Sequence, residues 1–138
     1  MSLRVIPLIV IAFIVYNVVV LFGPAGQAAD VILNRDVFSI TMPSGAAWNF
    51  KVGDLIMLLT MILLFAELIK STYTSSTQMI DHGLSMLVFI ACLVEFLLVQ
   101  KATTSVFFFI LIAALIDVVA GALIGIRTAR RDLNLGGE

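Results

Sequence analysis

The chain has 138 residues, of which 62% are hydrophobic and only 12% are charged. Soluble domains contain roughly 45–50% apolar and about 25% charged residues, so this composition excludes an ordinary soluble domain. The length indicates a single domain. The formal net charge of −1 excludes a basic surface for nucleic acid, and the single cysteine, Cys92, excludes an internal disulfide.

Four long apolar runs predict membrane-spanning helices. A helix needs about 20 apolar residues to cross the hydrocarbon core of a bilayer. We expect spans over residues 5–22, 54–70, 82–100 and 104–126. Runs of this length without alternating polarity favour helices over barrel strands. The predicted fold class is therefore an all-α membrane protein, a four-transmembrane-helix bundle that forms one integral membrane domain over residues 1–138.

The first run also has features of a secretory signal peptide. Arg4 precedes it, and Gly26-Gln27-Ala28 resembles a small-residue cleavage site. However, the run is longer than the usual apolar region of a signal peptide, which has roughly 7–15 residues. Gly23-Pro24 ends the run as a helix stop would. We therefore expect the segment to be retained as a span.

Lysine and arginine residues near the predicted helix ends favour an orientation with both termini in the cytoplasm. This orientation puts five of them on the cytoplasmic side: Arg4, Lys70, Arg127, Arg130 and Arg131. Residues 127–138 are then a short cytoplasmic tail, and residues 23–53 form an extracytoplasmic loop. The compact size and the uninterrupted spans favour a bacterial inner membrane.

The long first loop carries the pattern of a small β-hairpin. Apolar and polar residues alternate over residues 38–42 and again over residues 48–52, and Pro43-Ser44-Gly45 lies between them. We expect the hairpin to lie over the mouth of the bundle, with Trp48 in the membrane interface. The alternative is a short amphipathic helix around residues 29–37, followed by irregular chain.

Polar side chains at membrane depth are costly, so they are the candidate functional residues. They are Asn17 in the first span, Glu67, Glu95 and Asp117 in the other three, and His82 at the start of the third. The i, i+3 spacing of Glu67 and Lys70 predicts an ion pair, and the helical rise predicts similar depths for Asn17 and Glu95.

Glu95 and Asp117 have no predicted cation at their own depth. Each is therefore protonated, or shares hydrogen bonds with Asn17, Ser85, Tyr16 or water. Small residues follow Asp117 along one face of the fourth span, and the stripe comprises Ala113, Gly121 and Gly125. Gly121 and Gly125 form a GxxxG pattern, which is typical of close helix packing.

We expect this stripe to pack on the Ser85–Cys92–Glu95 face of the third span, which would bury both Glu95 and Asp117 within the bundle at different depths. The connection between the last two spans is short, so they form a tight antiparallel pair. The first two spans are then the more peripheral pair.

The function expected from these features is not enzymatic, since no catalytic groups are paired at one depth. One histidine makes a histidine metal site improbable, and no cofactor is expected. The leading hypothesis is an accessory or scaffold subunit, or a homo-oligomer, that acts through helix packing with the lipid bilayer and other membrane subunits as partners. The alternative is a small proton- or cation-coupled transporter or channel, in which Glu95, Asp117 and Glu67 form a staggered relay and His82 lies near its inner mouth.

Overall fold

The computed structural model describes residues 5–73 and 78–136, so Arg4 lies outside the described part. The protein is mostly helical and has one small two-stranded antiparallel sheet. Three helices are long and apolar enough to cross a membrane: α3 (Val52–Thr72), α4 (Gln78–Leu98) and α5 (Ser105–Leu135). The expectation of apolar helices compatible with a membrane is therefore confirmed for three of the four predicted spans.

The first helix, α1 (Ile9–Leu21), has only 13 residues and is shorter than the predicted span over residues 5–22. At 1.5 Å per residue it is about 20 Å long, against roughly 30 Å for the hydrocarbon core. The helix begins just after Pro7, which has no backbone N–H to donate. A membrane span over residues 5–22 therefore remains a prediction.

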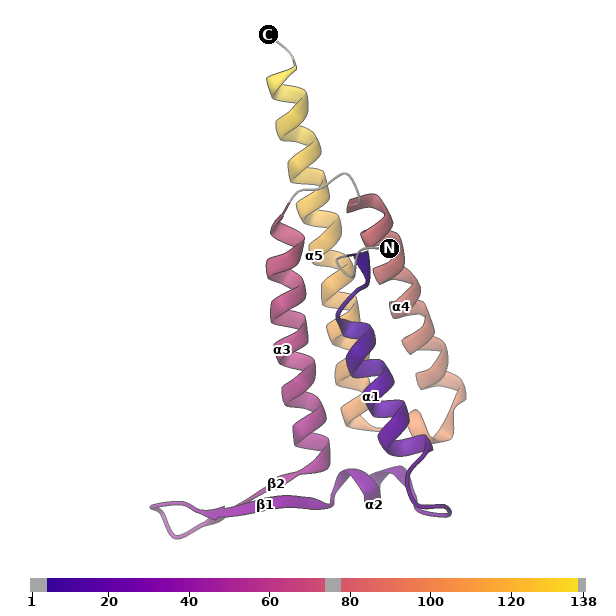
Figure 1. Ribbon diagram of the computed structural model, residues 1–138, viewed down its shortest axis with the longest axis vertical. Coiled ribbons are helices and arrows are strands. Elements are labelled where there is room, and N and C mark those ends of the chain that lie inside the picture. The colour runs from indigo at the N-terminus through magenta and orange to yellow at the C-terminus, as the bar shows by residue number, and fades with distance from the viewer. Residues whose placement is uncertain (1–4, 74–77, 137–138) are drawn as a thin grey trace.

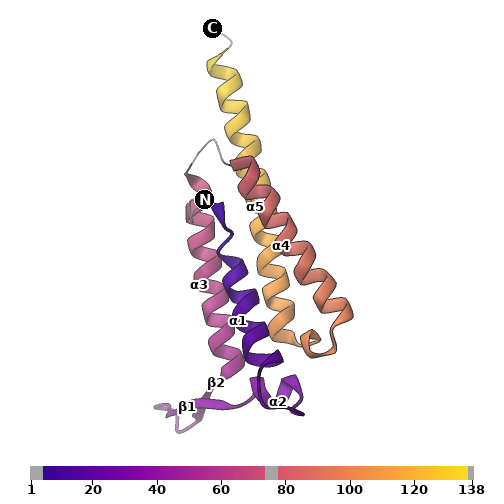
Figure 2. The same cartoon turned by 45° about the vertical axis from the view of Figure 1, so that its right-hand side comes forward.

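Helix α5 is the centre of the bundle. Both α3 and α4 pack along it, and α1 packs against α3 and α5 (Figure 1, Figure 2). The long helices alternate in direction along the chain, so α3 and α5 run parallel, and α1 begins and α5 ends toward the same end of the bundle (Figure 1). Beyond the bundle, α5 continues as a helix through most of the predicted tail.

The peripheral helix is α4, which corrects the expectation that the first two spans are the outer pair. Only 11% of the apolar stretch of α4 is buried, compared with 33% of that of α5. The sequence pattern missed this arrangement because the short α4–α5 connection fixes only that these two helices are neighbours. It does not determine which of them meets the other helices.

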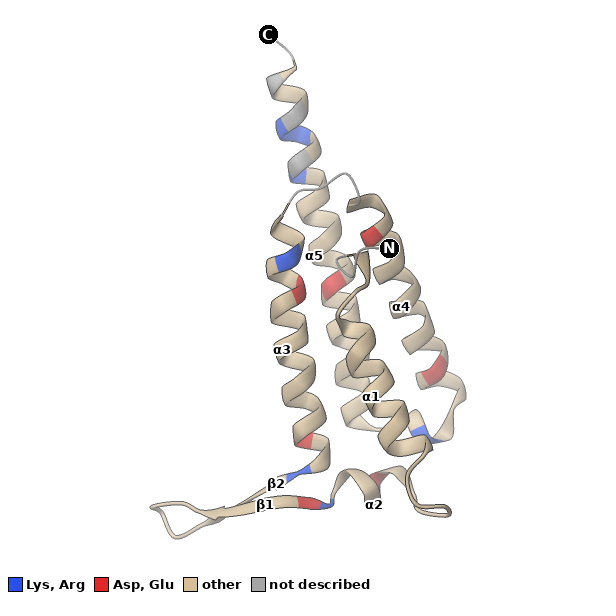
Figure 3. Cartoon of the chain, in the orientation of Figure 1, with Lys and Arg blue, Asp and Glu red and all other residues tan. Residues whose placement is uncertain are grey.

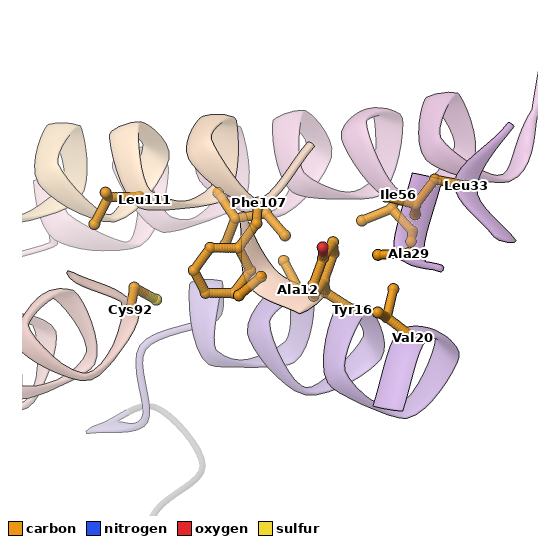
Figure 4. Packing of buried hydrophobic residues seen from close by; sticks show 11 residues of the cluster. Ala12, Tyr16, Val20, Ala29, Leu33, Ile56, Cys92, Phe107 and Leu111 are labelled. Carbon is orange, nitrogen blue, oxygen red and sulfur yellow. The ribbon is translucent and has the colours of Figure 1, made fainter. Parts of the chain in front are cut away.

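The hydrophobic core is built around Phe107 of α5, which is fully buried. Figure 4 shows the buried cluster to which Phe107 belongs, with side chains from α1, α2, α3, α4 and α5 spread along the bundle. The ring of Tyr16 approaches Phe107 edge-on at 4.9 Å, and Phe96 stacks near it at 6.3 Å. The Tyr16 hydroxyl donates to the carbonyl of Lys101 at 2.8 Å and lies 2.7 Å from Thr104 Oγ1, which ties α1 to the α4–α5 connection.

The long first loop contains both elements that the sequence offered as alternatives. A short helix, α2 (Ala29–Leu33), is followed by strands β1 (Asp36–Thr41) and β2 (Ala47–Lys51). The strands pair with Phe38 opposite Phe50 and Ile40 opposite Trp48. In the turn, the N–H of Gly45 donates to the carbonyl of Met42 at 2.8 Å, and Gly45 has φ +86°. This backbone conformation is typical of a hairpin turn that ends with a residue in the left-handed region.

The predicted hairpin is confirmed, but its predicted position over the mouth of the bundle is wrong. The two strands run sideways from the start of α3 and project beyond the helices (Figure 1, Figure 2). Helix α2 lies at the same end of the bundle, below α1 in Figure 1. The physical reason is that β2 joins α3 directly at Lys51 and Val52, with no linker in which the chain could fold back.

Candidate functional site

Two charged residues of α3, Glu67 and Lys70, form an ion pair near the end of the bundle where α1 begins. Lys70 Nζ lies 2.9 Å from Glu67 Oε1, one helical turn away, as the i, i+3 spacing predicts. The Glu67 side chain is only 2% exposed, whereas that of Lys70 is 21% exposed. The pair thus has a buried carboxylate and a partly accessible ammonium group.

The same two side chains bind the irregular segment that leads into α1. The second Glu67 oxygen, Oε2, accepts the backbone N–H of Leu8 at 2.8 Å, and Lys70 Nζ donates to the carbonyl of Ile6 at 3.0 Å. Backbone groups outside a helix have no water partners at membrane depth and must find partners in the protein. Glu67 and Lys70 supply these partners, and the acid also complements the positive end of the α1 dipole.

Asp117 of α5 belongs to this same polar cluster, which we call the α3–α4–α5 cluster. Its members are Glu67, Lys70, Asp81, His82, Ser85 and Asp117. Asp117 is only 5% exposed and is hydrogen-bonded by the Ser85 side chain from α4. Asp81 Oδ1 lies 3.6 Å from Lys70 Nζ, so one lysine faces acids from two helices.

A cavity of about 30 Å³ opens among the side chains of this cluster. A water molecule needs roughly 10–15 Å³ of such space, together with polar partners, so the cavity has room for one or two water molecules. His82 Nδ1 is buried and has no hydrogen-bond partner within the described chain. The cavity therefore combines space for water with acids, a lysine and an unpaired imidazole nitrogen.

The small-residue stripe of α5 makes room for the polar side chains of α4. A Cβ placed on Gly121 would lie 3.3 Å from His82 Nδ1, and one on Gly125 would lie 3.8 Å from Gln78 Nε2. Ala113 is 5% exposed, in the apolar part of the α5 surface. Gly121 and Gly125 thus face side chains rather than the backbone of another helix, which differs from the usual use of GxxxG.

Glu95 and Asn17 form a second polar contact, which is separate from the first. Asn17 Nδ2 donates to Glu95 Oε2 at 3.3 Å and to the carbonyl of Phe13 at 2.9 Å. The similar depth estimated for Asn17 and Glu95 is thus realised as a hydrogen bond between α1 and α4. Glu95 is half-buried, and its other oxygen, Oε1, is buried without a partner among the described residues.

Glu95 and Asp117 lie in separate polar contacts at different levels of the bundle. Asp117 contacts Ser85, which lies ten positions before Glu95, or about 15 Å along the axis of α4. Buried apolar side chains fill the space between the two levels, among them Cys92, Phe107, Ile110 and Ala114. Asp117 is instead grouped with Glu67 and Lys70 from α3, so it does have a cation in its vicinity.

Sequence reasoning missed the role of Glu67 as a partner for the start of α1. The only available signal was Pro7, which shortens the helix and leaves backbone groups without helical partners. It also missed Asp81 as a neighbour of Asp117, because that contact depends on how far α4 and α5 slide along each other, whereas Ser85 was among the predicted hydrogen-bond partners. No three metal-binding side chains converge on one point within residues 5–73 and 78–136.

The fold and the two polar contacts define a small, mostly helical protein with three helices long and apolar enough to cross a membrane. Comparisons with protein families, with curated proteins and with solved structures find no match for this chain.

Proposed function

We propose that the protein is a non-enzymatic membrane subunit that associates through α4, either with a partner subunit or with a second copy of itself. The observation that carries the proposal is that only 11% of the apolar stretch of α4 is buried within the chain, while the same helix carries the half-buried carboxyl group of Glu95. A polar group within a bilayer is stabilised when a neighbouring helix supplies a hydrogen bond.

Helix α4 has the surface that such an association needs. Large apolar side chains along it are exposed, including Leu87, Val94 and Leu98. Lipid tails can cover these side chains, but they cannot donate a hydrogen bond to a carboxyl oxygen. A donor on a second helix would add about 0.6–2 kcal/mol to an association that rests mainly on packing. Glu95 would therefore select the face of α4 at which the partner binds.

The separation of the two polar contacts argues against a continuous carboxyl relay. A relay needs groups within hydrogen-bonding reach, directly or through water. Between Glu95 and Asp117 the buried side chains are apolar, apart from the single thiol of Cys92. Glu67 is also fully engaged, since one oxygen is bound to Lys70 and the other to Leu8.

The test is the oligomeric state of the whole chain in lipid nanodiscs, measured by native mass spectrometry, together with the stoichiometry of any subunit that co-purifies. We expect a defined oligomer or a one-to-one partner. Glu95→Leu should weaken it by about 3- to 30-fold, because leucine neither donates nor accepts a hydrogen bond, while Glu95→Gln should retain it through its amide.

The matched control is Leu97→Ala, which lies on the same helix but on another face and is 68% exposed. It should leave the association unchanged. A wild-type chain that is monomeric and without a stoichiometric partner would contradict the proposal. An association that Leu97→Ala weakens as much as Glu95→Leu would show that Glu95 has no special part in it.

The second candidate function is proton or cation movement through the α3–α4–α5 cluster. The observation that favours it is the water-sized cavity between Asp117, His82 and the Glu67–Lys70 pair. Proton and cation flux into liposomes under an imposed gradient would test it. Flux that Asp117→Asn abolishes would support transport, whereas no flux in the wild type would exclude it. Glu95→Gln is the control, because its site lies outside the cavity.

A further inference from the structure

The β1–β2 hairpin is rigidly joined to the end of a membrane-spanning helix. Lys51 is the last residue of β2, and its backbone N–H donates to Asp54 Oδ2 at 3.0 Å in the first turn of α3. The N–H of Val52 donates to the carbonyl of Arg35 at 3.0 Å, just before β1. These bonds hold the base of the hairpin at the level where α3 begins.

The hairpin has one aromatic face and one polar face. Phe38 and Phe50 are opposite each other, as are Ile40 and Trp48, so these four side chains share a face. Their rings pack together, with Phe38 stacked on Phe50 at 4.8 Å and edge-on to Trp48 at 6.1 Å. On the other face, Ser39 is hydrogen-bonded to Asn49 at 2.6 Å.

The projecting part of the hairpin carries no charge. Residues 37–50 contain no lysine, arginine, aspartate or glutamate, while Arg35, Asp36 and Lys51 lie at the base (Figure 3). The bundle does not cover the aromatic face: Phe38 is 44% exposed, Ile40 47% and Trp48 45%. An isolated hairpin is marginally stable in water, and exposed strands in water usually carry charges against aggregation.

We propose that the aromatic face of the hairpin lies in the interfacial zone of the bilayer that α3 crosses, between the headgroups and the acyl chains. Three observations on the hairpin agree with this environment. It projects sideways at the level where the span ends, it presents aromatic rings on one side, and it lacks charge where lipid would meet it. Aromatic side chains concentrate in this zone of membranes because it is apolar on one side and wet on the other. The inference is independent of how α4 associates.

Trp48 is the only tryptophan of the chain, so its fluorescence tests the inference without any substitution. The full-length protein is reconstituted in phosphatidylcholine liposomes in which the lipid is brominated either close to the headgroup or near the middle of the bilayer. We expect blue-shifted emission, weak quenching by aqueous acrylamide, and quenching that is several-fold stronger with bromine close to the headgroup.

The control variant moves the reporter to the polar face, as Trp48→Phe combined with Asn49→Trp. Its emission should be red-shifted, quenched by acrylamide and insensitive to brominated lipid. Emission of Trp48 that is red-shifted and fully open to acrylamide would overturn the inference. Protection from both acrylamide and brominated lipid, growing with the ratio of protein to lipid, would also overturn it, because a second copy would then cover the face.

A substitution on each face gives an independent measurement. Ile40→Lys places a charge on the aromatic face and should reduce the quenching of Trp48 by headgroup-brominated lipid several-fold. Ser39→Lys places the same charge on the polar face and should leave that quenching unchanged. Equal effects of the two substitutions would contradict the assignment of the aromatic face to lipid. Since these residues lie in the projecting hairpin and outside the core, both variants retain the core contacts of the bundle.

Discussion

The Glu67 carboxylate of α3 accepts the backbone N–H of Leu8 at 2.8 Å, across 59 positions of the chain. A side chain of one helix thus serves as the N-terminal partner of another. Lys70 completes the arrangement by pairing with Glu67 and donating to Ile6. An ionisable residue inside a helix that is apolar enough to cross a membrane is normally taken as a sign of transport or catalysis. Here its structural role is to bind the backbone of the segment before α1.

Replacing Glu67 tests this account. We expect Glu67→Leu to destabilise the bundle by about 1–3 kcal/mol, because a buried donor on Leu8 and the Lys70 ammonium would both lose their acceptor. Glu67→Gln retains an oxygen for Leu8 and should cost less. Thermal unfolding in a mild detergent, followed by circular dichroism, measures both. Unchanged stability of Glu67→Leu would show that the contact contributes nothing.

Tyr16→Phe should also destabilise the protein. It removes the hydroxyl that bonds Lys101 and Thr104 but retains the ring against Phe107. A hydrogen bond of this kind contributes roughly 0.5–1.5 kcal/mol. Tyr73→Phe is the matched control, because that side chain is 74% exposed and should tolerate the loss of its hydroxyl. If the two variants unfold at the same temperature, Tyr16 does not tie α1 to the α4–α5 connection.

Two glycines that face different surroundings should respond differently to alanine. At Gly83 an added Cβ meets nothing within 4 Å, so Gly83→Ala should stabilise α4 by up to about 1 kcal/mol through helix propensity. At Gly121 the Cβ would approach His82 Nδ1 to 3.3 Å, so alanine there should yield less of this gain or none. Unfolding midpoints of the two variants give the comparison. A larger gain at Gly121 would contradict the packing of α4 on α5.

Cys92 provides a direct probe of core opening. Its side chain is 0% exposed, and it is the only cysteine in the chain. We expect a maleimide to label it only after the bundle unfolds, at a rate that rises in parallel with loss of helical signal under denaturant. A variant with Cys92→Ser and Ser105→Cys, which carries its thiol at an exposed position, should react at once. Rapid labelling of native Cys92 would show that α4 separates readily from the core.

The sequence predicted the features that depend on local pattern. Apolar runs located α3, α4 and α5, and the alternation around Pro43-Ser44-Gly45 located the hairpin. The spacing of Glu67 and Lys70 predicted their ion pair, since both residues lie on one helix. Each of these predictions rests on residues that are close together in the sequence and belong to the predicted element.

Features that depend on how the helices pack could not be predicted from the sequence. The length of α1 depends on Pro7 and on the α3 side chains that hold the preceding segment. The grouping of Asp117 with Glu67 rather than Glu95 depends on the axial offset between α4 and α5. The direction of the hairpin depends on the hydrogen bonds at Lys51 and Val52. None of these quantities has a signature in composition or periodicity.

The bonds from Glu67 and Lys70 to Leu8 and Ile6 also imply an order of assembly. While the chain is being made, the first apolar segment exists before α3 has been synthesised, so its irregular start has no partners yet. Leaving those backbone groups unpaired in apolar surroundings is unfavourable. The segment can pair them with Glu67 and Lys70 only once α3 has been made. The start of the first helix is therefore fixed late, by side chains 59 and 64 positions further along the chain.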